Sequence, residues 1–238
     1  MEVEKVLTAV YDEDLENGVF RIPEDIRHID GGAFSYCPNL RKLIVPNSID
    51  WLPDFYDCLF LESIEVSEGN EEYSSLDGVL FDKDKKLLVR FPRNHQATSY
   101  CVPQSVTGIC HFAFQCCENI EKISIPNSIK AMGRWIFYGC KKLREINISN
   151  RVTKLEANTF FECENLERIY IPNSVTEFDS KIFTNCDKLT IYCLKGSAAE
   201  KYAKENNIPV LDCKCYYKNE EVEDIVKNVE ENIEYPVI

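Results

Sequence analysis

PNSIKAMGRWIFYGCKKLREINI, residues 126–148, decides the fold, because the chain repeats its pattern every 23 residues. The next stretch, residues 149–171, reads SNRVTKLEANTFFECENLERIYI, and the one before, residues 103–125, reads PQSVTGICHFAFQCCENIEKISI. Further copies start at Pro23 and Pro172, and a copy that has lost two residues starts at Pro46. Repetition at a fixed period of about 20–50 residues is typical of a solenoid, in which each copy forms one coil and stacks on its neighbours.

Each position in a copy has a physical reading. The closing L-x-x-I-x-I predicts a short strand with alternate side chains facing inward, here Ile146 and Ile148, with Leu143 entering the strand. The proline that follows ends the strand ladder. The A-F-x-x-C segment predicts one turn of helix whose phenylalanine fills the interior. The phenylalanines expected to stack are Phe34, Phe114, Phe137, Phe160 and Phe183.

The same register places six of the twelve cysteines in one column. They are Cys37, Cys58, Cys117, Cys140, Cys163 and Cys186. Small, weakly polar thiols suit a buried column, so we expect free cysteines with a packing role. A disulfide between adjacent coils is conceivable on spacing but is not required. Reduced thiols favour an intracellular location.

The net charge and the hydropathy of the chain argue against several classes of partner and against membrane insertion. The formal net charge of −13 argues against a nucleic-acid partner and against binding to anionic lipid. No run of about 18 apolar residues predicts a transmembrane helix, and the acidic N-terminus does not resemble a signal peptide. We therefore expect a cytoplasmic protein without membrane insertion, or a surface or secreted one if a signal has been removed. We also expect a monomer that needs no cofactor.

The pattern IPNSIKAMGRWIFYGCKKLREINIS, residues 125–149, resembles the BspA-like class of leucine-rich repeats, also called the Treponema pallidum type. The resemblance covers roughly residues 19–211. It implies an α/β repeat solenoid, a curved right-handed leucine-rich-repeat superhelix. It would have a parallel sheet on the concave face, short helical turns on the other side and capped ends. Members of the class are linked to adhesion and protein binding, and none of the pattern positions is catalytic.

The domain organisation follows from where the period holds. We predict an N-terminal cap over residues 1–18, coils 1 and 2 over 19–66, and an irregular island over 67–102. Coils 3–6 then span residues 103–192, followed by a cap helix over 193–211 and an acidic tail over 212–238. Within the island, Val79–Phe81 and Leu87–Phe91 predict a hairpin, which either substitutes for a coil or forms a lobe that shapes the binding face. The tail predicts an amphipathic helix, folded back on the solenoid or docking a partner.

Signals of chemistry are weak. His28, His95 and His111 fall in different coils, so convergence on a metal or catalytic cluster is not expected. Cys213-x-Cys215 has one residue between its thiols, not the two to four usual at zinc sites, and Cys193 is a conceivable third ligand. No phosphate-binding, nucleophile-elbow or metalloprotease motif occurs. We therefore predict that the chain has no metal site and is not an enzyme.

The candidate site is the outward face of the strands. One predicted outward column is Lys42, Ser63, Lys122, Glu145, Arg168 and Thr190, and the next is Ile44, Glu65, Ser124, Asn147, Tyr170 and Tyr192. Tyr170, Tyr192 and Arg168 lie on consecutive coils and should form one patch, since tyrosine and arginine are enriched at binding hot spots. Alternatively, tyrosine simply suits a strand. The leading hypothesis is a protein-binding module of unknown partner, followed by a surface adhesin and then an enzyme.

Overall fold

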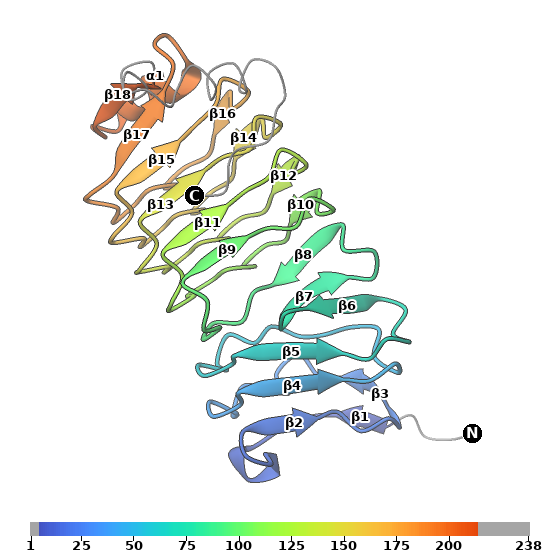
Figure 1. The fold of residues 1–238 in the computed structure, drawn as a ribbon. Coiled ribbons are helices and arrows are strands. Elements are labelled where there is room, and N and C mark those ends of the chain that lie inside the picture. Colours follow the sequence, from blue (N-terminus) through green and yellow to red (C-terminus); the bar gives the residue numbers. More distant parts are fainter. Residues whose placement is uncertain (1–4, 214–238) are drawn as a thin grey trace. The chain divides into compact units, whose positions relative to one another are not determined.

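A computed structural model describes residues 5–213, which fall in two compact units. Unit 1 lies within Met1–Gln96 and unit 2 within Ala97–Ile238. In each unit the L-x-x-I-x-I strands pair in parallel into a sheet, called here the front sheet (Figure 1). The predicted repeat solenoid is therefore confirmed. The predicted tail helix and Cys215 lie outside the described residues.

Unit 2 contains a front sheet of six parallel strands. These strands are β9 (Ser99–Cys101), β11 (Lys122–Ser124), β13 (Glu145–Asn147), β15 (Arg168–Tyr170), β17 (Thr190–Cys193) and β18 (Val210–Asp212). The coils that begin at β9, β11, β13 and β15 each also contain a second strand, of two residues, after the turn that follows the front strand. These strands, called here back strands, pair in parallel with those of neighbouring coils. The pairs are β10 (Gly108–Ile109) with β12 (Ala131–Met132), and β14 (Lys154–Leu155) with β16 (Glu177–Phe178). Each back strand follows the turn at the start of its copy of the repeat.

The core of unit 2 consists of equivalent apolar residues stacked coil upon coil. Ile146 and Ile148 are buried, as predicted, together with Leu143. The rings of Phe114, Phe137, Phe160 and Phe183 stack with centroids 5.2, 5.1 and 5.4 Å apart. The predicted phenylalanine ladder is thus confirmed in this unit. A single stacked interior of this kind keeps each coil dependent on its neighbours.

The predicted helical turn at A-F-x-x-C is wrong. In the 126–148 coil the backbone N–H groups of Trp135, Phe137 and Gly139 donate to carbonyls of the next coil, at 3.4, 2.9 and 2.8 Å. An α-helix would need those N–H groups for carbonyls four residues earlier. The residues between these donors form only tight turns. One such turn is closed by the 3.1 Å hydrogen bond from Cys140 N to Phe137 O. The segment is therefore a ladder of turns between coils.

This ladder requires left-handed backbone at two places per coil. Trp135 has φ of 58° and Gly139 has φ of 69°. The residues at the place of Trp135 in the other coils of unit 2 are Phe112, Asn158 and Lys181, with φ of 58–60°. A bulky residue at positive φ is strained, and the bonds to the next coil offset that cost.

The C-terminal end of unit 2 is closed by the predicted cap helix, α1 (Ala198–Glu205). The Ser197 side chain accepts a hydrogen bond from the N–H of Glu200 at 3.1 Å, as expected of an N-cap. Ala199 and Ala203 are buried. Tyr202 stacks on Phe178 with ring centroids 4.6 Å apart. The helix therefore covers the end of the phenylalanine ladder.

Unit 1 has a front sheet of three parallel strands, β2 (Val19–Arg21), β4 (Lys42–Val45) and β5 (Ser63–Val66). Its back strands β1 (Lys5–Leu7) and β3 (Ile26–Ile29) also pair in parallel. The region of the predicted N-terminal cap thus contains the strand β1. Because β1 pairs like any back strand and is followed by the 3-10 helix η1 (Asp12–Asp14), the predicted cap is an incomplete extra coil.

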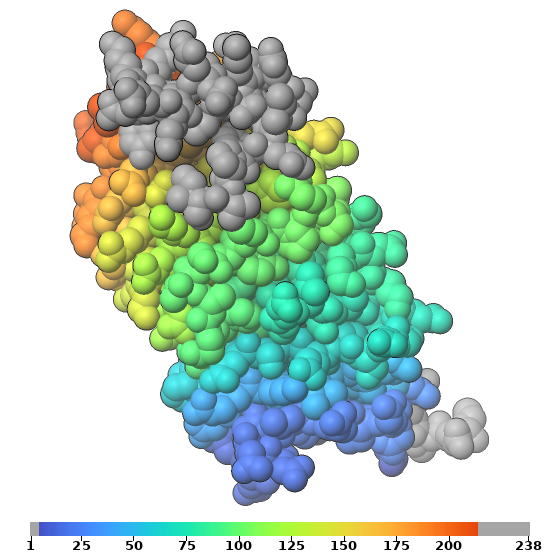
Figure 2. Space-filling view, in the orientation of Figure 1, coloured from blue at the N-terminus to red at the C-terminus, as the bar shows by residue number. Residues whose placement is uncertain are grey.

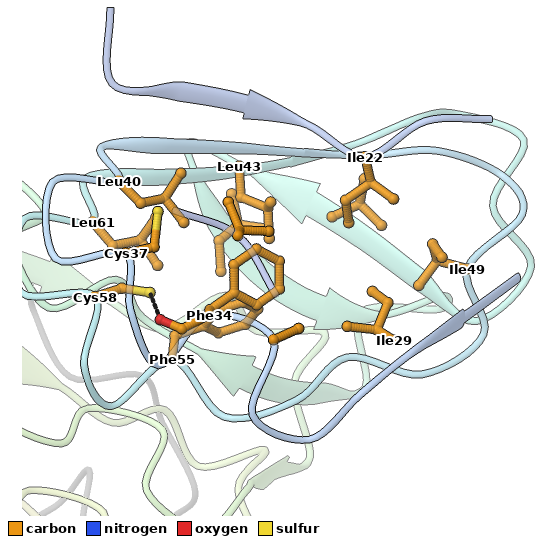
Figure 3. Packing of buried hydrophobic residues seen from close by; sticks show 14 of the residues in the cluster. Ile22, Ile29, Phe34, Cys37, Leu40, Leu43, Ile49, Phe55, Cys58 and Leu61 are labelled. Atoms are coloured by element: carbon orange, nitrogen blue, oxygen red, sulfur yellow. Dashed lines mark hydrogen bonds between the residues drawn. The ribbon is translucent and has the colours of Figure 1, made fainter. Parts of the chain in front are cut away.

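The interior of unit 1 follows the same rule with one difference. Phe34 and Phe55 lie 5.3 Å apart but are tilted by 50°. Figure 3 shows both rings among buried isoleucines and leucines, and a bond from Cys58 Sγ to the carbonyl of Phe34. Phe55 occupies the ladder position in the coil that has lost two residues. Its equivalence appears when copies are aligned on cysteine instead of proline.

The island forms the predicted hairpin and one strand more. β7 (Val79–Asp82) pairs antiparallel with β8 (Leu87–Arg90) and with β6 (Tyr73–Leu76). Asn70, which is fully buried, fixes where the island begins. Its side-chain amide donates to the carbonyls of Pro46 and Ile49, each at 2.8 Å. Its side-chain oxygen accepts from the N–H groups of Glu72 and Tyr73, at 3.0 and 2.8 Å.

Candidate functional site

The predicted outward columns exist within each unit. In unit 2 the register pairs Lys122 with Glu145, Glu145 with Arg168, and Arg168 with Thr190. The second column pairs Asn147 with Tyr170 and Tyr170 with Tyr192, with Ser124 one strand earlier. In unit 1, Lys42 pairs with Ser63 and Ile44 with Glu65. The alignment of these residues on the front sheets is observed. Binding by them stays a prediction.

Charges on this face largely neutralise one another. Arg168 Nη2 lies 2.9 Å from Glu145 Oε2 on the neighbouring strand, and Lys42 Nζ lies 2.6 Å from Glu65 Oε1. Exposed pairs of this kind contribute little stability. They do fix the orientation of the two long basic side chains. The front sheets therefore present ordered, mixed charge.

An apolar strip crosses the C-terminal strands of unit 2. Tyr170 is in register with Tyr192, and Tyr192 is in register with Leu211 of β18. Neighbouring strands lie about 4.8 Å apart, so the three side chains follow one another along the sheet. Leu211 is 50% exposed. Sequence reasoning missed it, because the strand Val210–Asp212 follows the cap helix and lies outside the 23-residue period.

One predicted site residue is partly engaged by the fold. Asn147 donates from Nδ2 to the carbonyl of Ile125 at 3.2 Å, across the step between two coils. Its amide therefore contributes to the packing of one coil on the next.

The column cysteines are packing groups. Cys140, Cys163 and Cys186 donate from Sγ to the phenylalanine carbonyl of the preceding coil, at 3.0, 3.0 and 2.9 Å. Burial raises the pKa of Cys37 to about 11 and of Cys58 to about 12. A thiol with so high a pKa is a poor nucleophile at neutral pH. Cys37, Cys58, Cys140, Cys163 and Cys186 of this column are free thiols.

Two of the three histidines, His95 and His111, contact backbone groups of the coils. His111 Nδ1 accepts from the N–H of Arg134 at 2.8 Å, which joins two coils. His95 Nε2 lies 2.9 Å from the carbonyl of Asp77, and its ring packs 4.5 Å from Phe91. Within residues 5–213, no cluster of three or more histidine, cysteine or acidic side chains is placed to hold a metal ion. In the same range no helix has the length and apolarity needed to cross a membrane.

Comparison with known proteins agrees with this geometry. Residues 11–87 and 90–208 match the BspA type leucine rich repeat region, in six copies. The chain belongs to the BspA-type leucine-rich repeat family. The resemblance inferred from the sequence is confirmed. No curated protein sequence matches this BspA-type chain.

Two solved structures are similar to this BspA-type protein. One is a leucine-rich repeat protein from Eubacterium ventriosum, 21% identical, with a TM-score of 0.60 over 74% of this chain and 54% of that one. The other is a leucine rich cell surface protein from Faecalibacterium prausnitzii, 22% identical, with a TM-score of 0.55 over 78% of this chain and 62% of that one. The chain spans less than two thirds of either protein. At these identities the likeness shows the fold.

Proposed function

We propose that this chain is a non-catalytic protein-binding module that engages its partner through the front sheets. The observation that carries the proposal is the strip of Tyr170, Tyr192 and Leu211, which has Arg168 held beside it by Glu145. Aromatic and arginine side chains dominate the binding energy of protein interfaces. Ordered side chains also lose less conformational entropy when a partner binds.

The remaining predicted residues would form the rim of this surface. Lys122, Ser124, Glu145, Asn147 and Thr190 continue the two columns of unit 2. Lys42 and Ile44 occupy the same places in unit 1. Polar rim positions add specificity more than affinity. The proposal therefore concentrates binding energy in the strip.

Affinity capture from a lysate of the source organism tests the proposal. The variant Arg168→Glu/Tyr170→Ala/Tyr192→Ala is compared with wild type after circular dichroism has shown that both fold. The matched control Lys130→Ala/Arg151→Glu/Glu177→Ala changes exposed residues of the same two coils and of the coil before them, away from the front sheet. A partner retained by the control and lost by the first variant supports the front sheet. Equal retention by both variants refutes it.

A second candidate function is that of a surface adhesin. It is favoured by the similarity to the cell surface protein from Faecalibacterium prausnitzii, and it would place the chain outside the cell. Immobilised extracellular-matrix proteins test it directly, with the same pair of variants. Binding lost only in the front-sheet variant would support an adhesin, while capture of a cytoplasmic protein alone would favour an intracellular module.

A further inference from the structure

Exposed apolar side chains are unevenly distributed between the units. Of the ten large hydrophobic side chains that are exposed among the described residues, nine lie in unit 1. Five of these nine lie in the loops that lead into the front strands of unit 1. We call them the aromatic edge: Tyr11, Tyr36, Tyr56, Leu59 and Phe60. Their exposed fractions run from 40% for Leu59 to 66% for Tyr36.

Contacts join the three loops of the aromatic edge into one surface. The rings of Tyr11 and Tyr36 stack with centroids 6.0 Å apart. The N–H of Phe60 donates to the carbonyl of Pro38 at 3.4 Å. The Asn39 amide donates to the carboxylate of Asp12 at 2.6 Å. In Figure 1 these loops lie at the left ends of β2, β4 and β5, and Figure 2 shows the same blue and light-blue edge at the surface.

The regular coils do not carry apolar residues at two of these positions. Leu59-Phe60 directly follow the column cysteine of their coil. In unit 2 the same two places are Glu118-Asn119, Lys141-Lys142, Glu164-Asn165 and Asp187-Lys188. The fold therefore accepts charged or polar residues here, and packing does not demand leucine and phenylalanine.

The aromatic edge is surrounded by acidic side chains. Asp12, Glu13 and Asp14 form η1 beside Tyr11, and Asp57 follows Tyr56. All four are exposed, and none forms an ion pair with another described residue. The negative charges of Asp12 and Asp14 also help to raise the pKa of Cys37, after burial, so both carboxylates lie near the Cys37 thiol. Clustered charge of one sign attracts a partner of the opposite sign.

Arg41 shows which chemistry the edge accepts. Its guanidinium lies 5.8 Å from the centre of the Phe60 ring, while Nη1 lies 2.8 Å from Glu62 Oε1. A cation is thus already held over one ring with a carboxylate alongside it. Cation–π attraction of this type extends to tyrosine rings.

We propose that the aromatic edge of unit 1 is a second interaction surface, separate from the front sheets, which binds a polypeptide segment carrying Lys or Arg next to apolar side chains. The apolar side chains of that segment pack on Tyr36, Leu59 and Phe60. Its basic side chains lie over tyrosine rings and face Glu13 and Asp57. Neither Tyr170 nor Tyr192 takes part, so this surface and the front sheet can fail independently.

Fluorescence anisotropy tests this with the full chain and a short fluorescein-labelled peptide that places Leu-Phe pairs between lysines. One comparison peptide carries glutamate in place of lysine, and another carries serine in place of Leu-Phe. We expect wild type to bind the first peptide at least about tenfold more tightly than either comparison peptide, because both kinds of contact are needed. Raising NaCl from about 0.05 to about 0.5 M should weaken binding.

Two variants locate the binding. Leu59→Glu/Phe60→Asn copies the residues of the next regular coil and should weaken binding at least about tenfold. This variant adds negative charge, so purely electrostatic attraction would become stronger instead. Glu13→Gln/Asp57→Asn should lower the affinity a few-fold and reduce its salt dependence. The matched control Asn119→Ser/Asn165→Ser changes the same position in two coils of unit 2 and should bind like wild type.

Three results would overturn the proposal. They are equal binding of all three peptides, wild-type affinity in Leu59→Glu/Phe60→Asn, and loss of affinity in the unit 2 control. Sedimentation velocity can give a fourth result that would overturn the proposal. Concentration-dependent dimers that disappear in Leu59→Glu/Phe60→Asn would identify the occupant as a second copy of this chain.

Discussion

The two units build the same coil and use it differently. In unit 2 the phenylalanine rings lie 5.1–5.4 Å apart with interplanar angles of 11–30°, and the loops leading into the front strands are charged or polar after each column cysteine. In unit 1 the rings of Phe34 and Phe55 are tilted by 50°, and the loops expose aromatic rings. Regular repetition serves stability, whereas departures from it create distinctive surface.

This contrast can be measured because each unit contains one tryptophan, Trp51 in unit 1 and Trp135 in unit 2. Trp51→Phe leaves a reporter for unit 2, and Trp135→Phe leaves one for unit 1. Phenylalanine is tolerated at the second place, since Phe112 holds the same left-handed backbone one coil earlier with φ of 60°. Fluorescence then follows the denaturation of each unit separately.

The largest expected effect is the loss of unfolding free energy when a phenylalanine of the ladder is replaced, and this loss should differ between the units. Phe137 is buried between two rings, so Phe137→Ala should lower the unfolding free energy of unit 2 by about 3–5 kcal/mol. Phe55 stacks on Phe34 at a steep tilt, and Phe55→Ala should cost unit 1 about 1 kcal/mol less than that. Urea titrations followed by the two tryptophans measure both. Equal losses would mean that ring stacking does not distinguish the units.

Asn70 tests whether the island is held by a single side chain. Asn70→Ala removes four hydrogen bonds of a fully buried amide and should destabilise unit 1 by about 2–3 kcal/mol. The control Asn165→Ala removes a half-buried amide of unit 2, which donates to the carbonyl of Lys141 at 2.7 Å, and should cost under about 1 kcal/mol. If the two variants lose the same stability, the island is held by other contacts.

The thiol column should show a smaller difference in the same direction. Cys163 Sγ lies 3.0 Å from the carbonyl of Phe137, whereas Cys58 Sγ lies 3.7 Å from the carbonyl of Phe34. Cys163→Ala should therefore cost unit 2 about 1–2 kcal/mol and Cys58→Ala should cost unit 1 less. Cys163→Ser, which keeps a donor, should recover part of the loss. A larger cost at Cys58 would contradict the geometric ranking.

Titration checks the buried state of Cys58 independently. Burial raises its pKa from 9.0 to about 12, so the folded form resists losing the proton that the unfolded chain gives up more easily. The stabilising contribution is complete below pH 9 and is lost as the pH rises toward 12. Unit 1 should lose stability over that window, and Cys58→Ala should make the loss shallower. An unchanged slope would show that other groups dominate.

The sequence predicted the interior features that repeat from one coil to the next. The phenylalanine ladder, the cysteine column and the inward isoleucines follow from one period. The turn at A-F-x-x-C was mistaken for helix because its spacing fits both. Only the carbonyls one coil away, such as Thr159 O for Phe137 N, decide between them.

The surface could be predicted only in part. The outward columns follow from strand alternation, so Tyr170 and Tyr192 were found. Leu211 was missed because β18 joins the sheet after a helix, outside the period. The aromatic edge was missed because aligning the shortened coil on its proline hides the equivalence of Leu59-Phe60 with charged pairs elsewhere. Binding itself depends on a partner that no single chain encodes.

The smallest expected effect concerns that edge. Leu59→Glu/Phe60→Asn should change the unfolding free energy of unit 1 by less than about 0.5 kcal/mol, because both side chains are 40% or more exposed. The tryptophan assay in the Trp135→Phe background measures it. A loss above about 1 kcal/mol would mean that these residues stabilise the coil. If the variant keeps its stability but no longer binds the peptide of lysines and Leu-Phe pairs, selection for binding explains why this coil departs from the pattern of unit 2.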